Sequence, residues 1–159
     1  TAVDRIWSDI ERALRPHVAR GARLWFTGHS LGGAMAALAA ERLAPSHVCT
    51  IGAPRVGDDA FVEAFSHVSA TRLYYCADVV PTVPQRLFGF RHVGEPWYID
   101  RHARIHRNPT SSFVVGSRIR GGAVFAATRD WQSLAGSVVA RSLADHAIVN
   151  YADALRSKP

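Results

Sequence analysis

The sequence lacks the features that mark several common classes of protein. Of its 19 basic residues, all but Lys158 are arginines, and they are scattered with no block of five or more like charges. The formal net charge of +6 therefore does not indicate a nucleic-acid interface, which gathers basic residues on one face. No apolar run approaches the roughly 18 residues that span a bilayer, and no signal peptide is visible. The compartment stays open; a secreted or membrane-surface protein is compatible with the sequence.

Cysteine is also scarce, and the cysteines present do not indicate a location. Cys49 and Cys76 lie in apolar, strand-like runs, which is typical of buried thiols on neighbouring strands. A disulfide would require close Cα atoms and an oxidising compartment, neither of which the sequence reveals. The segment H-A-R-I-H (102–106) could bind a metal if it were helical, but no Glu or Cys accompanies it. We expect a solvated basic segment there, and no metal or cofactor.

What the chain does contain is enough apolar surface for one folded domain. Its 159 residues are 48% hydrophobic, which predicts a single domain over 1–159. The chain starts at Thr1, inside an expected helix, so we expect it to be the later part of something longer. The predicted strands are 22–27, 47–52, 71–76 and an edge or hairpin strand W-Y-I-D (97–100). The predicted helices are 3–20, 31–43, 58–65, an interrupted 129–143 and 147–156, and no element is predicted over 107–127.

The order of these elements indicates an α/β fold. Strands alternating with helices are typical of a mostly parallel sheet with right-handed crossovers. The strands lack polar alternation, as expected when helices cover both faces of a sheet.

A serine among glycines follows the first predicted strand. G-H-S-L-G (28–32) fits the pattern G-x-S-x-G at a sharp strand-to-helix turn, which indicates a nucleophile at Ser30. We expect a strained backbone at Ser30 and collisions for any side chain at position 28 or 32. The N–H of Leu31 would start the following helix and is a candidate oxyanion donor, and His29 is assigned to substrate contact. The alternative is a serine that only caps the helix.

A serine nucleophile needs a base, and the base needs an orienting acid. On this kind of scaffold the acid comes next in the chain and lies just past a later strand. Asp78 directly follows L-Y-Y-C-A and is the favoured acid, although it could be a simple turn aspartate. Asp58 and Asp59 also follow a strand, but they suit the start of a helix.

The base should be a histidine downstream of the acid. His146 is the last histidine in the chain and immediately precedes a predicted helix, so it is the favoured base. The remaining candidates lie on other elements, before the relevant loops or in the arginine-rich region: His17, His47, His67, His92, His102 and His106.

These residues carry a resemblance to a known family. Over about residues 5 to 156 the chain resembles the class 3 (fungal-type) lipases of the α/β-hydrolase superfamily. The similar segments are, in order, T-G-H-S-L-G-G-A, T-I-G-A-P-R-V-G-D, D-V-V-P-T-V-P, G-F-R-H-V-G-E-P-W-Y-I and D-H-A-I-V-N-Y. The resemblance implies Ser30, Asp78 and His146 as a catalytic triad, and a non-catalytic histidine in the fourth segment.

The departures from the family are also informative. Family members usually carry an N-terminal half with further strands, a lid and a second oxyanion donor, which these 159 residues do not include. The stretches 107–127 and A-T-R-D-W-Q match no family motif. On the family's strand order, the strand at 23–27 should be central, so we expect one of its edges to lie bare in this chain.

The expected activity is hydrolysis of carboxylic esters by way of an acyl-enzyme. From the resemblance alone, the expected substrates are acylglycerols, then phospholipids cleaved as by a phospholipase A1, with feruloyl-type esters a weaker option. The expected partner is thus a lipid or ester, which could lie at a membrane or micelle surface. The rival hypotheses are a lipase-like binding module without turnover and an interaction domain with a chance G-x-S-x-G.

Overall fold

The computed structural model describes residues 1–127 and 144–156. Within these residues the protein forms one five-stranded sheet with the strand order β1-β2-β3-β4-β5. The strands are β1 (Trp25–His29), β2 (His47–Ile51), β3 (Ala70–Tyr75), β4 (Glu95–Ile99) and β5 (Ile105–Arg107). The first four run parallel, and β5 pairs antiparallel with β4. The mostly parallel sheet confirms the expected fold class.

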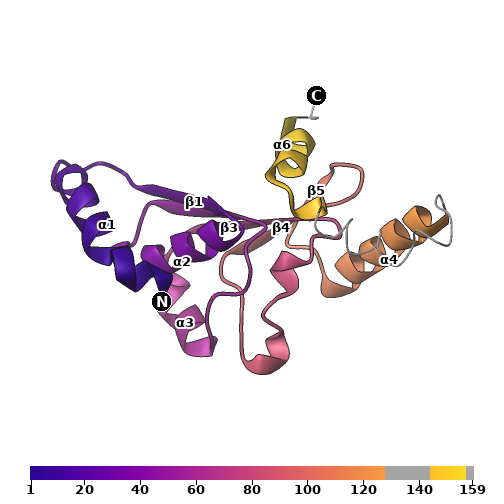
Figure 1. Ribbon diagram of the computed structural model, residues 1–159, viewed down its shortest axis with the longest axis horizontal. Helices are drawn as coiled ribbons and strands as arrows, with labels where there is room; N and C mark the ends of the chain where they lie inside the picture. The colour runs from indigo at the N-terminus through magenta and orange to yellow at the C-terminus, as the bar shows by residue number, and fades with distance from the viewer. Residues whose placement is uncertain (128–143, 157–159) are drawn as a thin grey trace.

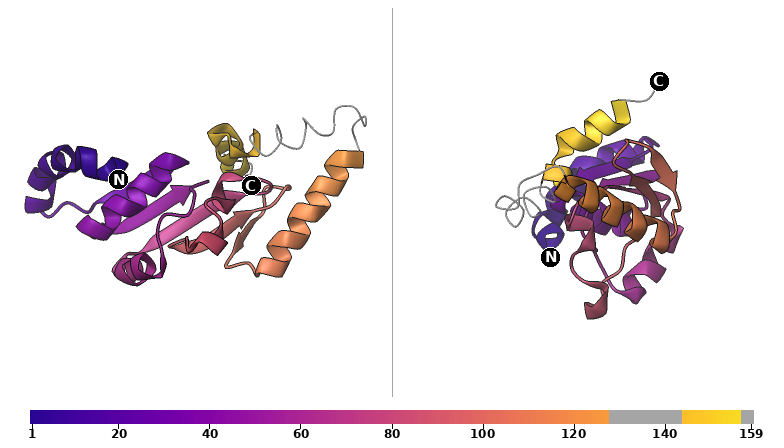
Figure 2. Two further views of the ribbon diagram at one scale, coloured as in Figure 1. Left: turned by 60° about the horizontal axis from the view of Figure 1, so that its bottom comes forward. Right: turned by 90° about the vertical axis from the view of Figure 1, so that its right-hand side faces the viewer.

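Helices connect and cover these strands (Figure 1). They are α1 (Ala2–Ala19), α2 (Leu31–Leu43), α3 (Asp59–Ala64), α4 (Ser111–Ala127) and α6 (Ile148–Arg156), with short 3-10 turns η1 (Phe65–His67), η2 (Val80–Thr82) and η3 (Arg86–Phe88). The helix predicted over 129–143 lies outside the described residues. Figure 2 shows α1 and α4 at opposite ends of the sheet.

Local sequence explains why the central helix forms where it does. The α2 sequence consists largely of Ala and Leu, which are strong helix formers. Five of its small residues are buried, so the helix lies close to the sheet. The helix ends at Ala44, which adopts the left-handed conformation, and Pro45 follows and cannot continue the helix. A short, straight α2 therefore leaves directly from the end of β1.

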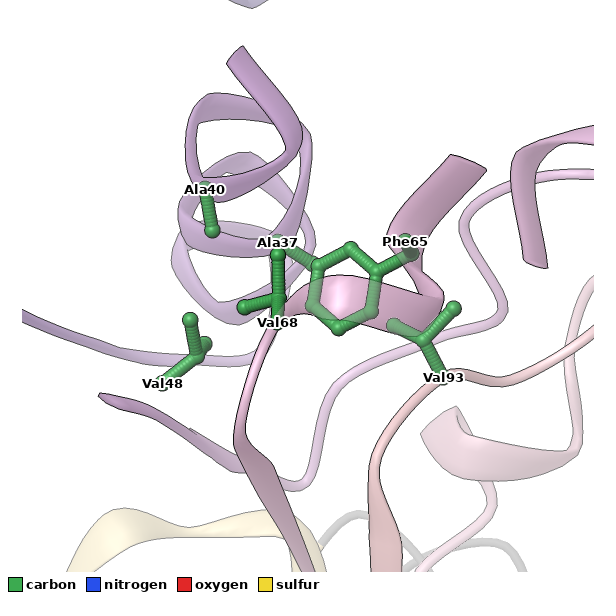
Figure 3. Packing of buried hydrophobic residues seen from close by; sticks show 6 residues of the cluster. All are labelled: Ala37, Ala40, Val48, Phe65, Val68 and Val93. Carbon is green, nitrogen blue, oxygen red and sulfur yellow. The ribbon is translucent and has the colours of Figure 1, made fainter. Parts of the chain in front are cut away.

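Two hydrophobic clusters lie on opposite faces of the sheet. On one face, Val48 of β2 packs with small residues of α2 and with Phe65, as Figure 3 shows. On the other face, Leu73 and Ile99 pack against Tyr151 and Ala154 of α6. Alternate residues of a strand point to opposite faces, so one sheet serves both clusters. The helices α2, α3 and α4 lie on one side of the sheet and α6 on the other (Figure 1).

The lateral edge of β1 is open in the described part of the chain. The strand pairs with β2 and lies at the end of the strand order, and the side chain of Trp25 is 70% exposed. The expectation of a bare edge on this strand is therefore confirmed. Beside it is an apolar groove of about 350 Å³ between α1, β1 and α2, whose lining includes Val3, Ile10, Leu14, Trp25, Phe26 and Met35.

Several predicted boundaries need correction. The first strand begins and ends two or three residues later than predicted, because Gly28 and His29 still pair with Thr50 and Ile51. The W-Y-I-D segment was predicted as an edge or hairpin strand: it is not an edge strand, since β4 pairs on both sides, but it does form an antiparallel hairpin with β5. Strand β5 and helix α4 were not predicted.

Candidate active site

The turn after β1 has the strained geometry expected of a nucleophile elbow. Ser30 has φ 57° and ψ −129°, a region that residues with side chains rarely adopt. Its side chain makes no capping hydrogen bond to α2, so the helix-cap alternative is not what the structure shows. The main-chain N–H of Ser30 instead donates to the carbonyl of Ile51, 2.9 Å away, which holds the turn against β2.

Two of the glycines around Ser30 allow a close approach of strand and helix. A Cβ on Gly28 would lie 2.6 Å from the nitrogen of Gly33, and a Cβ on Gly33 would lie 2.7 Å from the oxygen of Gly28. The expected collision at position 28 is confirmed, but the expectation for position 32 is wrong. No described atom lies within 4 Å of a Cβ built on Gly32, because that position faces the groove beside β1. The second constrained glycine is Gly33.

The structure brings the three predicted catalytic side chains together. The Nε2 atom of His146 lies 2.8 Å from the Ser30 hydroxyl. On the other side of the ring, Nδ1 lies 3.1 and 3.0 Å from the two carboxylate oxygens of Asp78. An ionised carboxylate only accepts, so Nδ1 carries the proton and Nε2 is free to accept one from Ser30. This is the arrangement of a nucleophile, a base and an orienting acid.

Asp78 is fully buried and fixed from several directions. Its Oδ1 accepts from the N–H of Val80 at 2.9 Å, and its Oδ2 accepts from the Tyr151 hydroxyl at 2.6 Å. The guanidinium of Arg118, from α4, donates to the main-chain carbonyl of Asp78 at 3.2 Å. A buried carboxylate without donors would be costly, and Val80 and Tyr151 supply one to each of its oxygens.

Tyr151 is a site residue that the sequence did not reveal. Its hydroxyl donates to Asp78 and accepts from the N–H of Tyr75 at 3.0 Å, so it joins α6 to the end of β3. Burial and the neighbouring Asp78 charge raise the pKa of this phenol far above its usual value, so it stays protonated and remains a donor. Tyr151 lies within the helix predicted over 147–156, but its contact with Asp78 depends on how that helix packs against the sheet.

The candidate oxyanion donor and the predicted substrate contact lie beside Ser30. Leu31 is the first residue of α2, so its N–H has no acceptor within the helix and points out at the same end. The imidazole of His29 lies against His146, with 4.6 Å between ring centroids and 2.7 Å from His29 Nε2 to the carbonyl oxygen of His146. The roles of both residues stay predictions.

The alternative acids have structural partners of their own. Asp58 caps α3 by accepting from the N–H of Phe61 at 2.9 Å, and Asp59 pairs with Arg91 at 2.8 Å. Both carboxylates thus act at the start of a helix, as their alternative interpretation predicted.

The alternative bases also lie in other environments. The His92 ring nitrogen contacts the carbonyl of Pro81 at 2.7 Å, and burial lowers the pKa of His92 to about 3. His106 bonds to Asp100 at 2.9 Å. The H-A-R-I-H segment runs from a loop into β5 and is not helical. Among residues 1–127 and 144–156, no group of three potential metal-ligating side chains is present.

None of the described helices combines the length and the apolar character that a membrane span requires.

The fold is that of an α/β hydrolase, and its sheet brings a serine, a histidine and an aspartate together. The family model for lipase (class 3) matches residues 1–88, which include Ser30 and Asp78. The chain belongs to the class 3 lipase family.

Curated relatives and solved structures agree with this assignment. The chain is 39% identical over 80 residues to "Secreted mono- and diacylglycerol lipase 1" of Fusarium solani, covering 46% of this chain and 24% of the relative. It is 31% identical over 127 residues to "Phospholipase A1-II 3" of Oryza sativa subsp. japonica, covering 69% of this chain and 30% of the relative. It also resembles a solved triacylglycerol lipase described as having a serine protease triad at its catalytic centre. In that comparison the TM-score is 0.57 and the identity 28%, over 64% of this chain and 43% of the other. The chain thus spans about a quarter to a third of the length of these curated relatives.

Proposed function

We propose that the protein is a serine hydrolase that cleaves carboxylic esters of lipids. The single observation that carries this proposal is the continuous hydrogen-bonded chain from the Ser30 hydroxyl through His146 to Asp78. Membership of the class 3 lipase family supports lipid esters as the substrate class.

The proposed mechanism assigns one task to each residue. Ser30 Oγ attacks the ester carbonyl while His146 Nε2 takes its proton. The N–H of Leu31 stabilises the developing oxyanion, because a helix N-terminus offers a free donor and a partial positive charge. His146 then gives the proton to the leaving alcohol, and water, activated by the same base, releases the acid from the acyl-enzyme.

Asp78 supports this cycle without exchanging protons. Its carboxylate accepts from His146 Nδ1, which fixes the tautomer of the base and stabilises the imidazolium that forms. The Tyr151 hydroxyl and the N–H of Val80 keep the carboxylate in one orientation, while Arg118 holds the main chain of Asp78.

Phospholipids are the second candidate substrate class. The match to the rice protein named phospholipase A1 extends over 69% of this chain, compared with 46% for the fungal acylglycerol lipase. The identity is higher with the acylglycerol lipase, 39% compared with 31%, so we propose acylglycerols first and phospholipids, cleaved as by a phospholipase A1, second.

Turnover on esters of graded chain length tests the proposal. The full chain and its Ser30→Ala variant are assayed on p-nitrophenyl esters below and above the micellar limit, and on diacylglycerol and phosphatidylcholine vesicles. We expect hydrolysis by the wild type and only background rates for Ser30→Ala, because the variant has no nucleophile. Equal rates for the two proteins would overturn the assignment of Ser30, and binding to vesicles without turnover would indicate a lipase-like binding module instead.

A further inference from the structure

The imidazole of His29 makes two contacts with the candidate base. The rings of His29 and His146 are stacked, with an interplanar angle of 30° and centroids 4.6 Å apart. In addition, His29 Nε2 lies 2.7 Å from the main-chain oxygen of His146. The two residues are 117 positions apart in the chain, so this contact joins the elbow directly to the turn before α6.

The chemistry of the contact fixes the proton on His29. A carbonyl oxygen only accepts hydrogen bonds, so the Nε2 atom of His29 must carry the proton and donate. The carbonyl of His146 is available because the chain bends at Ala147. The N–H of Asn150, which would bond to His146 in a continuous helix, donates to Ala147 at 3.0 Å instead. His29 thus satisfies an acceptor that the bend leaves free.

We propose that His29 is a positioning residue for His146, which it holds by its main chain and by one face of its ring. The inference rests on the proposed function, since it assigns His146 as the base. It replaces the substrate contact that the elbow sequence predicted for His29.

Four contacts together determine where the His146 imidazole can lie. Asp78 and Ser30 hold its two nitrogens at 3.0 and 2.8 Å, but hydrogen bonds at the ends of a ring leave it free to tilt about the line that joins them. The stacked His29 ring opposes that tilt, and the bond to the carbonyl fixes the backbone from which the ring extends. His29 neither gives nor takes a proton in the cycle. A small displacement of a base lowers the rate of proton transfer much more than it changes binding of the ester.

Substitutions that separate the two contacts test the proposal. His29→Gln keeps an N–H donor at nearly the same reach, His29→Asn has the same amide one methylene shorter, and His29→Phe keeps a ring without a donor. The control is His47→Gln, which replaces another hydrogen-bonded imidazole of the same sheet, 2.9 Å from Ser69 Oγ. For each protein we would measure kcat and KM on a soluble p-nitrophenyl ester, the rate at which a fluorophosphonate probe modifies Ser30, and the melting temperature.

The expected result is an effect on kcat and not on KM. His29→Asn and His29→Phe should lower kcat and the probe rate together by about tenfold, the equivalent of one hydrogen bond. His29→Gln should retain about a third of the wild-type kcat, and His47→Gln should behave as wild type. A rise in KM with unchanged kcat would overturn the proposal in favour of a substrate contact. Unchanged kcat and KM in all three variants would overturn it outright.

Solvent exchange of the His146 Nδ1–H proton tests the positioning role of His29 without requiring hydrolysis, so it can fail independently of the proposed function. In protein labelled with ¹⁵N-histidine, the Nδ1–H signal of His146, assigned by its loss in His146→Gln, should exchange faster with solvent in His29→Asn than in His29→Gln. Equal exchange in these two variants would contradict the positioning role even if the wild type hydrolysed nothing. Hydrolysis that survives Ser30→Ala would instead contradict the proposed function and leave the exchange result standing. Asn and Gln differ by one methylene, so this pair carries the test if His29→Phe fails to fold.

Discussion

The carboxyl-terminal end of the sheet and the lateral edge of β1 differ in how many of their polar groups have hydrogen-bond partners. At the carboxyl ends of β1 and β3, Ser30, His146 and the fully buried Asp78 form a closed set of hydrogen bonds. Along the lateral edge of β1, Trp25 is 70% exposed and an apolar groove of about 350 Å³ lies open.

This contrast separates the hydrogen bonds that the chain completes by itself from the strand edge that it leaves unpaired. The polar groups of the site find partners within residues 1–127 and 144–156. In the part of the chain that the structure describes, the outer edge of β1 pairs with no strand and lies beside an apolar groove, which is the kind of strand edge that pairs with another strand. The contacts among Ser30, His146 and Asp78 are therefore made within this chain, whereas we expect the β1 edge to favour association with another chain.

Replacing Asp78 tests the hydrogen-bonded site at the carboxyl ends of the strands, and we expect it to have the largest effect on turnover. We expect Asp78→Asn to lower kcat by up to about 10⁴, by analogy with serine proteases, because an amide no longer holds His146 in the productive tautomer. Steady-state kinetics on a soluble ester measures this change. Asp59→Asn, an exposed aspartate on α3 that pairs with Arg91, is the matched control and should keep wild-type kcat. Similar losses in both variants would mean that Asp78 is not the orienting acid.

The two glycines of the elbow test how closely strand and helix must approach. Gly28→Ala should lower the free energy of unfolding by about 3 kcal/mol, because the new Cβ meets the backbone of α2, which cannot move aside cheaply. Gly32→Ala meets no described atom and should be neutral or stabilise by up to about 1 kcal/mol, as alanine favours a helix. Urea unfolding of both variants measures the difference. A cost at Gly32 as large as at Gly28 would show that something covers the groove.

A charged side chain on the lateral edge of β1 tests the other region of the comparison. We expect it to change the free energy of unfolding least. Trp25→Lys should change the free energy of unfolding by no more than about 0.5 kcal/mol, while lowering self-association, since lysine on an edge strand opposes edge pairing. Sedimentation velocity at increasing concentration measures the association. Leu87→Lys removes an apolar side chain that is 80% exposed away from this edge, and should not change association. A matching decrease in that control would trace association to exposed apolar surface in general.

The elbow could be predicted because its pattern is local in the sequence. Ser30, Asp78 and His146 could be predicted to lie together because they follow one another in the order that this scaffold requires. The pattern at 28–32 needs only a strand before it and a helix after it, and Asp78 directly follows the L-Y-Y-C-A run at the end of a strand. The roles of these residues in catalysis remain predictions.

Other features depend on packing that no local pattern encodes. Helix α4 was not predicted because its Gly- and Ser-rich segment has a weak helical signal. Tertiary contacts anchor it: Tyr98 donates to Ser117 at 3.0 Å, and Arg118 reaches the carbonyl of Asp78. The error at Gly32 has a similar cause, since the pattern does not say which glycine faces the sheet and which faces the groove.

The docking of α6 has a consequence for how activity responds to heat. This nine-residue helix immediately follows the turn that carries His146, and it contributes Tyr151 to the core, while Ile148 and Val149 are 44% and 60% exposed. Its buried contacts come from Tyr151 and Ala154, and segments with few buried apolar contacts are the ones that open first in sub-global fluctuations. Each such opening separates the imidazole from the serine and the carboxylate at once, while the rest of the sheet stays folded. On the proposed function, we therefore expect activity to be lost on heating before the sheet unfolds.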